Sequence, residues 1–251
     1  MIYHKLLTDA RFGEKKLALL VDPDKQQLGS LAELGLFAAE SGVDYILLGG
    51  SLLLRDQLDD CVHHLKTQSQ LPIILFPGST WQISSEADAL LFLSLISGRN
   101  AELLIGQQVL AAPLLKDLKL EVLSTGYMLI DGGNATSVCY ISQTMPIPAN
   151  KPEIAVATAL AGKYIGMKMF YLDAGSGAHN TVPFEMIRAV RKATELPLFV
   201  GGGIRTPDQA AKAAQAGADI IVVGTAIEHD QAVLPALCQA VHSANHIAEW
   251  S

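Results

Sequence analysis

The chain has 251 residues, of which 50% are hydrophobic and 17% are charged, and its formal net charge is −7. This length and hydrophobic fraction suit one large core, so we expect a single domain over residues 1–251. The acidic balance, without a basic stripe, argues against a nucleic-acid partner, because proteins that bind nucleic acids neutralise phosphates with clustered Lys and Arg.

Short apolar runs alternate with longer amphipathic stretches along the chain, which is the pattern of repeated βα units. The predicted strands cover residues 17–22, 45–48, 72–76, 89–93, 121–130, 169–172, 197–200 and 219–223. The predicted helices cover residues 30–41, 52–68, a stretch that ends at 115, 153–164, 183–194, 207–216 and a region at the C-terminal end, and residues 135–151 are expected to be irregular. Eight such units in about 250 residues predict an α/β fold, a (β/α)₈ TIM barrel, with a doubly wound open sheet as the alternative.

Two glycine turns follow the last two predicted strands. Gly201-Gly202-Gly203 ends one apolar run, and Gly224-Thr225 ends the next. Glycine lets backbone N–H groups approach a ligand closely, and in a TIM barrel the loops after strands seven and eight commonly bind phosphate. The sequence therefore predicts a phosphorylated substrate.

Asp22 ends the first predicted strand, and function in this fold lies at the carboxyl ends of the strands. A carboxylate there can bind Mg²⁺, act as a base or cap the next helix, and we favour a functional role. Asp24, which follows Pro23, is expected to be a turn or capping residue. Ser51 follows Gly49-Gly50 after the second strand, and its position alone favours a cap for the helix predicted to start near residue 52.

Asp173 ends the sixth predicted strand and opens a Gly-Ser-Gly loop. A carboxylate beside apolar walls tends to have a raised pKa and suits proton abstraction. The alternative is a carboxylate that accepts hydrogen bonds from the amides of residues 174–177. Tyr171 faces the same side of the strand, either as barrel filling or as a donor to substrate.

Arg99 and Asn100 follow the fourth predicted strand. Arg99 is suited to a bidentate phosphate contact, and the alternative is a solvated helix start. Lys25 and Arg205 are the other cations expected near the mouth of the barrel. Trp81, in the loop after the third strand, is either an exposed aromatic or part of a pocket wall.

The sequence shows no segment of the kind that inserts into membranes. The first residues lack the apolar stretch of a signal peptide, and the longest apolar run, residues 87–96, is too short to cross a bilayer. The three cysteines have neither paired nor metal-like spacing. We therefore expect a cytoplasmic protein with no stable membrane insertion.

Motifs from the first predicted strand to the last resemble those of the geranylgeranylglyceryl phosphate synthase family, and together they are far more specific than the glycine turns alone. They are Leu20-Val21-Asp22-Pro23-Asp24-Lys25, Leu48-Gly49-Gly50-Ser51, Phe76-Pro77-Gly78-Ser79, Ser97-Gly98-Arg99-Asn100, Pro146-Ile147-Pro148, Lys151-Pro152-Glu153-Ile154-Ala155-Val156-Ala157 and Tyr171-Leu172-Asp173-Ala174-Gly175-Ser176-Gly177, with the two glycine turns. The resemblance implies a TIM-barrel prenyltransferase of phospholipid biosynthesis. It would join a polyprenyl diphosphate, typically geranylgeranyl diphosphate, to the primary hydroxyl of sn-glycerol 1-phosphate, with Mg²⁺ as cofactor and diphosphate as the second product.

The resemblance also assigns residues, and it implies a homo-oligomer, either a dimer or a hexamer. Asp22 and Ser51 take the metal positions, which replaces the cap interpretation of Ser51. Asp173 takes the place of the catalytic base, together with Tyr171. The positions implied to bind substrate are Tyr171, Leu172, Asp173, Ala174, Gly175, Ser176, Gly177, Gly202, Gly203, Gly224, Thr225, Arg99 and Asn100. Relatives often carry Glu at the position of Asp173, and one branch carries Lys where this chain has Leu20.

Two other functions stay open from the sequence. A sugar-phosphate isomerase would use two opposed carboxylates, here Asp22 and Asp131, without a metal. A non-catalytic protein that binds polyprenyl phosphates would keep the same pockets without turnover. A requirement for Mg²⁺ separates the first from the prenyltransferase, and transfer of a labelled prenyl group excludes the second.

Overall fold

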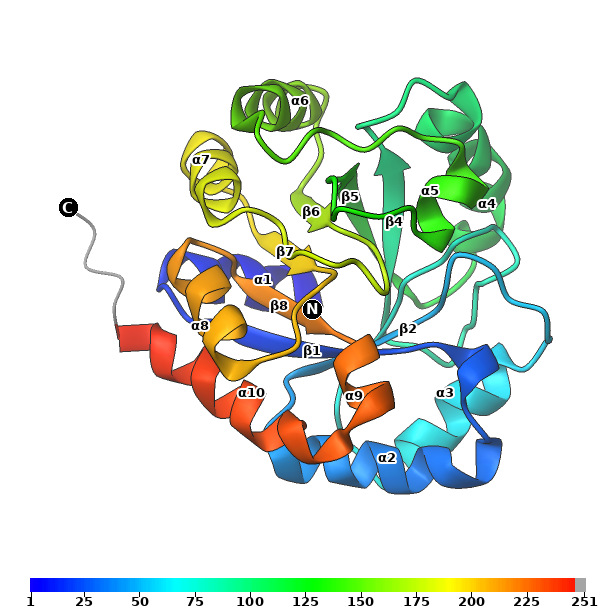
Figure 1. The fold of residues 1–251 in the computed structure, drawn as a ribbon. Coiled ribbons are helices and arrows are strands. Elements are labelled where there is room, and N and C mark those ends of the chain that lie inside the picture. Colours follow the sequence, from blue (N-terminus) through cyan, green and yellow to red (C-terminus); the bar gives the residue numbers. More distant parts are fainter. Residues whose placement is uncertain (247–251) are drawn as a thin grey trace.

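Eight parallel strands close into a barrel, and helices surround it on the outside (Figure 1). The computed structural model describes residues 1–246. The strands are β1 (Lys16–Val21), β2 (Tyr45–Leu48), β3 (Ile73–Leu75), β4 (Ala89–Leu95), β5 (Glu121–Leu129), β6 (Met169–Asp173), β7 (Leu198–Gly201) and β8 (Ile220–Val223). Each strand pairs with the next, and β8 pairs with β1, so the predicted TIM barrel is confirmed and the open sheet is wrong.

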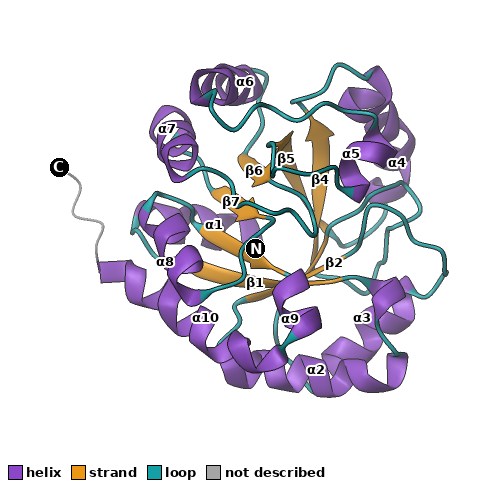
Figure 2. Cartoon of the chain, viewed as in Figure 1, coloured by secondary structure: helices purple, strands orange, loops and turns teal. Residues whose placement is uncertain are grey.

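The helices form a ring around the strands, as Figure 2 shows by colour. The α-helices are α1 (Ile2–Arg11), α2 (Leu28–Ser41), α3 (Leu58–Thr67), α4 (Gln107–Lys116), α5 (Ser137–Ser142), α6 (Pro152–Tyr164), α7 (Phe184–Thr194), α8 (Pro207–Gln215), α9 (Thr225–His229) and α10 (Leu234–His242). Short 3₁₀ turns cover η1 (Pro23–Lys25), η3 (Gln231–Val233) and η4 (Ser243–His246), and a π-helical turn, η2 (Glu102–Gly106), leads into α4. The predicted C-terminal helical region contains α9 and α10, and residues 247–251 lie outside the described residues.

The helix predicted over residues 52–68 is wrong at its start, because α3 begins only at Leu58. The segment before it is held in a loop by two hydrogen bonds to the turn after β1. Leu54 N donates to Asp24 Oδ2 at 2.6 Å, and Gln57 Nε2 donates to Pro23 O at 2.7 Å. Asp24 thus has the structural role expected of it.

Two helices were not expected from the sequence. Helix α5 lies within the stretch predicted to be irregular. Helix α1 covers the N-terminal end of the barrel and packs Leu6, which is almost fully buried, into the barrel interior. Its first turn is fixed by Glu121, whose carboxylate accepts from Ile2 N and Tyr3 N at 2.5 and 3.0 Å.

The core has two layers because the side chains of each strand alternate between the barrel axis and the helices. On β6, Tyr171 belongs to the inner layer, and Leu172 belongs to the layer between strands and helices. Phe76 and Phe199 stack on Tyr171, with ring centroids at 5.1 and 5.8 Å. The inner layer below the carboxyl ends of the strands is therefore filled by aromatic rings.

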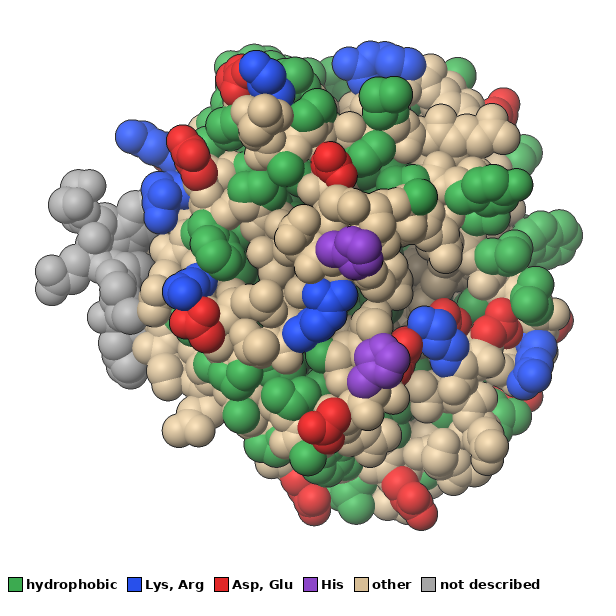
Figure 3. All heavy atoms as spheres, viewed as in Figure 1, with side chains coloured by type: hydrophobic (Ala, Val, Ile, Leu, Met, Phe, Trp, Pro, Cys, Tyr) green, Lys and Arg blue, Asp and Glu red, His purple; other side chains and the backbone are tan. Residues whose placement is uncertain are grey.

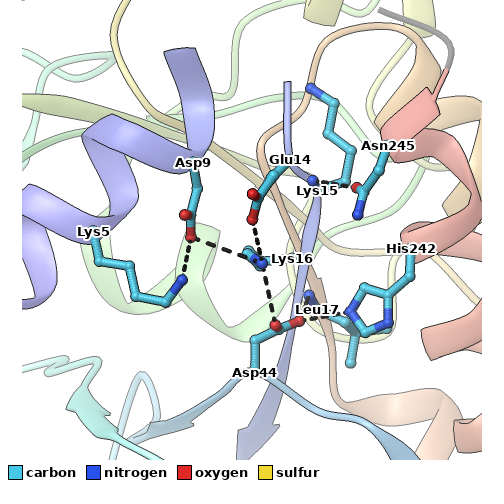
Figure 4. Close-up of polar contacts among 9 residues, drawn as sticks. All are labelled: Lys5, Asp9, Glu14, Lys15, Lys16, Leu17, Asp44, His242 and Asn245. Carbon is cyan, nitrogen blue, oxygen red and sulfur yellow. Dashed lines mark hydrogen bonds and ion pairs between the residues drawn. The ribbon is translucent and has the colours of Figure 1, made fainter. Parts of the chain in front are cut away.

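A charge network joins the elements at the N-terminal end of the barrel (Figure 4). Lys16, at the start of β1, lies 2.9 Å from Glu14, 3.8 Å from Asp44 and 3.9 Å from Asp9 of α1. Asp44 also contacts His242 Nε2 of α10 at 2.8 Å. This end of the barrel is held by polar contacts and takes no part in the cavity described below.

Asp219 is the buried charge on which this end depends, with 1% exposure. Its carboxylate lies 3.3 Å from Lys15 Nζ and 2.9 Å from Arg191 Nε, and it accepts from Leu198 N at 3.0 Å. Asp219→Ala leaves two cations without this partner, so we expect the free energy of unfolding to fall by about 3–5 kcal/mol in urea titrations. The exposed-pair control Asp208→Ala should cost less than about 1 kcal/mol, and an equal loss in both variants would contradict the prediction.

Candidate active site

A cavity of about 670 Å³ lies at the carboxyl ends of the strands. It is lined by the turns after β1, β2, β3, β5, β6, β7 and β8. Of the predicted site residues, ten line it: Asp22, Ser51, Tyr171, Asp173, Ser176, Gly177, Gly202, Gly203, Gly224 and Thr225. On the face shown in Figure 3, acidic and basic side chains are scattered among neutral ones and form no basic patch.

Asp22 stands half-buried at the cavity wall, directly after β1. Its Oδ1 accepts from Asp24 N at 3.1 Å, and its Oδ2 lies 3.8 Å from Lys25 Nζ. Burial raises the pKa of the Asp22 carboxyl, and the hydrogen bond from Asp24 N and the charge of Lys25 oppose that shift. A partly desolvated carboxylate with a free lone pair is suited to a cation.

Gly50 packs directly against Asp22 and brings Ser51 into the same cavity. A Cβ on Gly50 would lie 3.4 Å from the Asp22 carboxylate, which is ordinary van der Waals contact, so the two segments are direct neighbours. Ser51 cannot cap a helix, because α3 starts seven residues later, at Leu58. The cap interpretation from position alone is therefore wrong.

The oxygen donors of Asp22 and Ser51 fit a hard cation such as Mg²⁺, which commonly takes one or two carboxylates and completes its shell with water and phosphate. Within residues 1–246 no group of three or more His, Cys, Asp or Glu side chains could hold a metal by itself. A metal held by Asp22 and Ser51 would take its remaining ligands from water or substrate phosphate.

Asp173 lies at the end of β6 with 7% exposure, and both of its oxygens are engaged. Tyr127 OH donates to Oδ2 at 2.5 Å, and Gly175 N donates to Oδ1 at 2.7 Å. The amide contact matches the structural alternative for this residue, but each oxygen retains a lone pair for a substrate hydroxyl. Burial raises the pKa of the Asp173 carboxyl, while the two hydrogen bonds oppose the shift.

Tyr127 on β5 is a site residue that the sequence analysis did not identify. It lines the cavity, it is 5% exposed, and β5 pairs with β6 so that Tyr127 lies beside Tyr171. The alternation within the predicted strand 121–130 is a signal for an inward side chain, but the contact with Asp173 depends on the strand register. Burial raises the pKa of Tyr127 well above its usual value, so its hydroxyl stays a donor.

Tyr171 fills the barrel as one interpretation expected, and its role as a donor to substrate stays a prediction. Its ring fills the barrel between two aromatic neighbours, and it also lines the cavity. Its hydroxyl lies against Gly201, where a Cβ would come within 2.5 Å of it. Gly201 is thus required for the position of Tyr171.

The glycine turns after β7 and β8 come together with the loop after β6. Gly202 and Gly203 have φ of +83° and +71°, and a Cβ on Gly202 would lie 2.6 Å from Gly175 N. Ser176 Oγ lies 3.1 Å from Thr225 Oγ1, which joins the β6 and β8 loops. Hydroxyls and closely approached backbone in one concave site are suited to a phosphate group.

Arg205 fixes the loops that form this cradle. Its guanidinium donates to the carbonyl oxygens of Ala178, His179 and Gly203, so it links the loop after β6 to the loop after β7. It also lines the cavity. We interpret it as the residue that holds the cradle in shape.

Five predicted site residues do not line the cavity: Leu172, Ala174, Gly175, Arg99 and Asn100. Leu172 faces the helices, and Gly175 acts through its N–H on Asp173. Arg99 is exposed and donates to the carbonyls of Ile96 and Gly98, and Asn100 Oδ1 accepts from Glu102 N. The substrate contacts of Arg99 and Asn100 stay predictions that the cavity geometry does not support.

An apolar pocket adjoins the cavity. It is lined mainly by the loop after β3 and by β4, α4 and α5, and it shares Ser51, Leu93, Tyr127 and other residues with the larger cavity. Trp81 is not among the residues that line it, and at 91% exposure it projects from the surface. A cradle suited to an anion thus lies beside an apolar space.

Asp131, the second carboxylate of the isomerase alternative, does not face Asp22 across the cavity. It is exposed, it is absent from the cavity wall, and its Oδ1 accepts from Gly133 N at 2.9 Å. No helix of residues 1–246 has both the length and the apolar character needed to cross a membrane.

The closed barrel, its glycine turns and its two adjoining pockets define a TIM-barrel protein built for a ligand with an anionic end and an apolar end. Sequence comparison gives the family. The chain belongs to the PcrB family, which matches residues 10–242.

Relatives and a solved structure agree with this assignment. Geranylgeranylglyceryl phosphate synthase of Chitinophaga pinensis is 50% identical over 97% of this chain and 96% of its own length. Geranylgeranylglyceryl phosphate synthase of Methanothermobacter marburgensis is 45% identical over 88% of this chain and 90% of its own length. The crystal structure of (S)-3-O-geranylgeranylglyceryl phosphate synthase from Thermoplasma acidophilum with sn-glycerol-1-phosphate has a TM-score of 0.91 at 32% identity, covering 97% of this chain and 99% of that one.

Proposed function

We propose that this chain is a prenyltransferase that joins a polyprenyl diphosphate to the primary hydroxyl of sn-glycerol 1-phosphate, with geranylgeranyl diphosphate as the donor. The observation that carries the proposal is the placement of Asp173 in a cavity that has the glycine cradle on one side and the apolar pocket on the other. The family assignment and the named relatives support it.

The chemistry follows from this placement. The glycerol oxygen forms a bond to C1 of the prenyl chain, the bond from C1 to the diphosphate oxygen breaks, and the hydroxyl proton passes to the Asp173 carboxylate. The cradle holds the phosphate end, so the hydroxyl is positioned for attack and the entropic part of the barrier falls. Mg²⁺, held by Asp22 and Ser51, would supply positive charge for the departing diphosphate.

The test of the function is product formation. The protein is incubated with Mg²⁺, sn-glycerol 1-phosphate and prenyl diphosphates of graded length, and the products are identified by mass. A prenylglyceryl phosphate supports the proposal and gives the donor length. Absence of this ether, with binding of the donor retained, would instead support a non-catalytic binding protein.

We also propose a homo-oligomer. Its support is a row of exposed apolar side chains on the turn η2 and helix α4, formed by Ile105, Val109, Leu110 and Leu114, each 59–63% exposed. Large exposed apolar patches mark interaction surfaces. Sedimentation velocity of the protein, compared with Leu110→Lys, tests this surface.

Tyr127→Phe should shift the pH dependence of the reaction. Loss of the hydroxyl removes a hydrogen bond that opposes the upward shift of the Asp173 pKa, so that pKa rises further. Asp173 acts as a base only when ionised, and therefore the rate falls as pH drops through its pKa, at a higher pH in the variant. On the alkaline side the rate should fall by less than about tenfold. The measurement is kcat/KM against pH. If the fall in rate on the acid side occurs at the same pH in Tyr127→Phe as in the wild type, the hydrogen bond from Tyr127 does not influence the Asp173 pKa.

A further inference from the structure

An ion pair at the cavity edge joins the turn after β1 to helix α9 after β8. Lys25 Nζ lies 3.1 and 3.0 Å from the two carboxylate oxygens of Glu228. The same ammonium group lies 3.8 Å from Asp22 Oδ2. All three residues line the cavity, although Lys25 and Glu228 are 203 positions apart in the chain. Closure of the barrel between β1 and β8 brings them together.

Lys25 differs from the other cation of the cavity wall. Among the described residues that line the cavity, the basic side chains are Lys25 and Arg205, and the guanidinium of Arg205 is bound to loop carbonyls. The ammonium group of Lys25 instead forms ion pairs with the carboxylates of Asp22 and Glu228. With both carboxylates ionised, this cluster of one cation and two anions has a net charge of −1.

We propose that Lys25 binds the diphosphate end of the prenyl donor, and that Glu228 occupies Lys25 until that diphosphate arrives together with its divalent cation. In this arrangement Lys25 exchanges one anionic partner for another. Glu228 thus determines specificity, because its negative charge disfavours binding of a diphosphate that carries no divalent cation. The inference rests on the proposed function for the identity of the donor.

The exposure of the pair allows such an exchange. The side chains of Lys25 and Glu228 are 46% and 24% exposed, and pairs of this kind contribute little to stability. The lysine ammonium is a compact charge on a flexible stem, and phosphate oxygens accept strong charge-assisted hydrogen bonds. The pair is thus unlike Lys15–Asp219, whose side chains are 8% and 1% exposed.

The charges explain the selectivity. A bare diphosphate that approaches Lys25 meets two carboxylates, and like charges placed together disfavour binding. A divalent cation at Asp22 changes the net charge of the cluster from −1 to +1. Removal of the Glu228 charge should therefore help diphosphate most when no divalent cation is present.

The experiment is calorimetric titration of the whole protein with inorganic diphosphate, once with EDTA and once with Mg²⁺. We expect Glu228→Gln to bind diphosphate about fivefold more tightly than the wild type in EDTA, with a smaller gain in Mg²⁺. Lys25→Met should bind about tenfold more weakly in Mg²⁺. The matched controls are Glu153→Gln and Lys151→Met, from an exposed Lys–Glu pair whose members do not line the cavity, and they should bind as the wild type does.

Several outcomes would overturn the inference. One is a Glu228→Gln variant, shown to be folded by its thermal unfolding curve, that binds diphosphate in EDTA no more tightly than the wild type. Another is an equal gain for sn-glycerol 1-phosphate, which would place Lys25 at the other substrate. The proposed function fails separately: if no prenylglyceryl phosphate forms while Glu228→Gln still gains affinity in EDTA, the anion exchange stands and the transfer reaction does not.

Discussion

Asp22→Ala is expected to lower kcat/KM in the presence of Mg²⁺ by about 100- to 1000-fold, because a metal that stabilises a leaving diphosphate contributes several kcal/mol. Asp22 is the half-buried carboxylate at the cavity wall beside Ser51, and it supplies the anionic oxygen of the proposed metal site. The measurement is initial rate against Mg²⁺ concentration, and saturation with the metal should be lost together with activity.

Asp131→Ala is the control for Asp22→Ala. It removes a carboxylate from the same end of the barrel, but Asp131 is exposed and does not line the cavity. We expect nearly unchanged rates in this variant. An isomerase with two opposed carboxylates would lose activity in both variants, and an Asp22→Ala protein with normal Mg²⁺-dependent turnover would remove Asp22 from the metal site.

Asp173→Asn should lower kcat by about 100- to 10,000-fold, the range for loss of a general base. The amide keeps the size of the side chain and can still accept from Tyr127, but it cannot take up the hydroxyl proton. The KM for sn-glycerol 1-phosphate should change little, because the phosphate end is held by the glycine cradle. Steady-state kinetics with each substrate varied separates these two effects.

Asp173→Glu is the matched variant for Asp173→Asn, since it keeps an ionisable carboxyl group. We expect it to retain much more activity than Asp173→Asn. If both variants lose activity equally, the position rather than the proton acceptor matters, and if Asp173→Asn turns over normally, Asp173 is not the base.

The carboxyl ends of the strands were predictable from the sequence because an Asp or a glycine turn follows the apolar run of the strand. Asp22 and Asp173 directly follow apolar runs, and the glycine turns end two others. In a parallel barrel all such ends meet on one side, so a list of strand ends is already a list of candidate site residues. This reasoning placed Asp22, Asp173, Gly202 and Gly224 at the cavity.

Contacts that depend on register or barrel closure were not predictable. The bond from Tyr127 to Asp173 requires the alignment of β5 with β6, and the pair of Lys25 with Glu228 requires β8 to close on β1. The helix predicted from residue 52 was wrong for the same kind of reason. Its first residues are held by Asp24 and Pro23, whose hydrogen bonds no local pattern reveals.

Motif resemblance and geometry differ most at Arg99. The resemblance implies a substrate contact, but in the structure its guanidinium is bound to the carbonyls of its own turn. A motif records which residues occur together and not what each side chain touches. The basic side chains that line the cavity are Lys25, within the Asp-Pro-Asp-Lys motif, and Arg205.

The aromatic filling of the barrel determines on which side substrates can enter and products can leave. Tyr45, Tyr171 and Phe199 are at most 1% exposed along the inner layer, and α1 covers the far end with Leu6. Reactants and products therefore do not pass through the barrel and must enter and leave on the side of the carboxyl ends of the strands. The lipid-like ether must dissociate before the next long-chain donor can bind, so we expect this product to be a competitive inhibitor with respect to the donor. We also expect the product to dissociate faster when detergent or a bilayer is present to take it up.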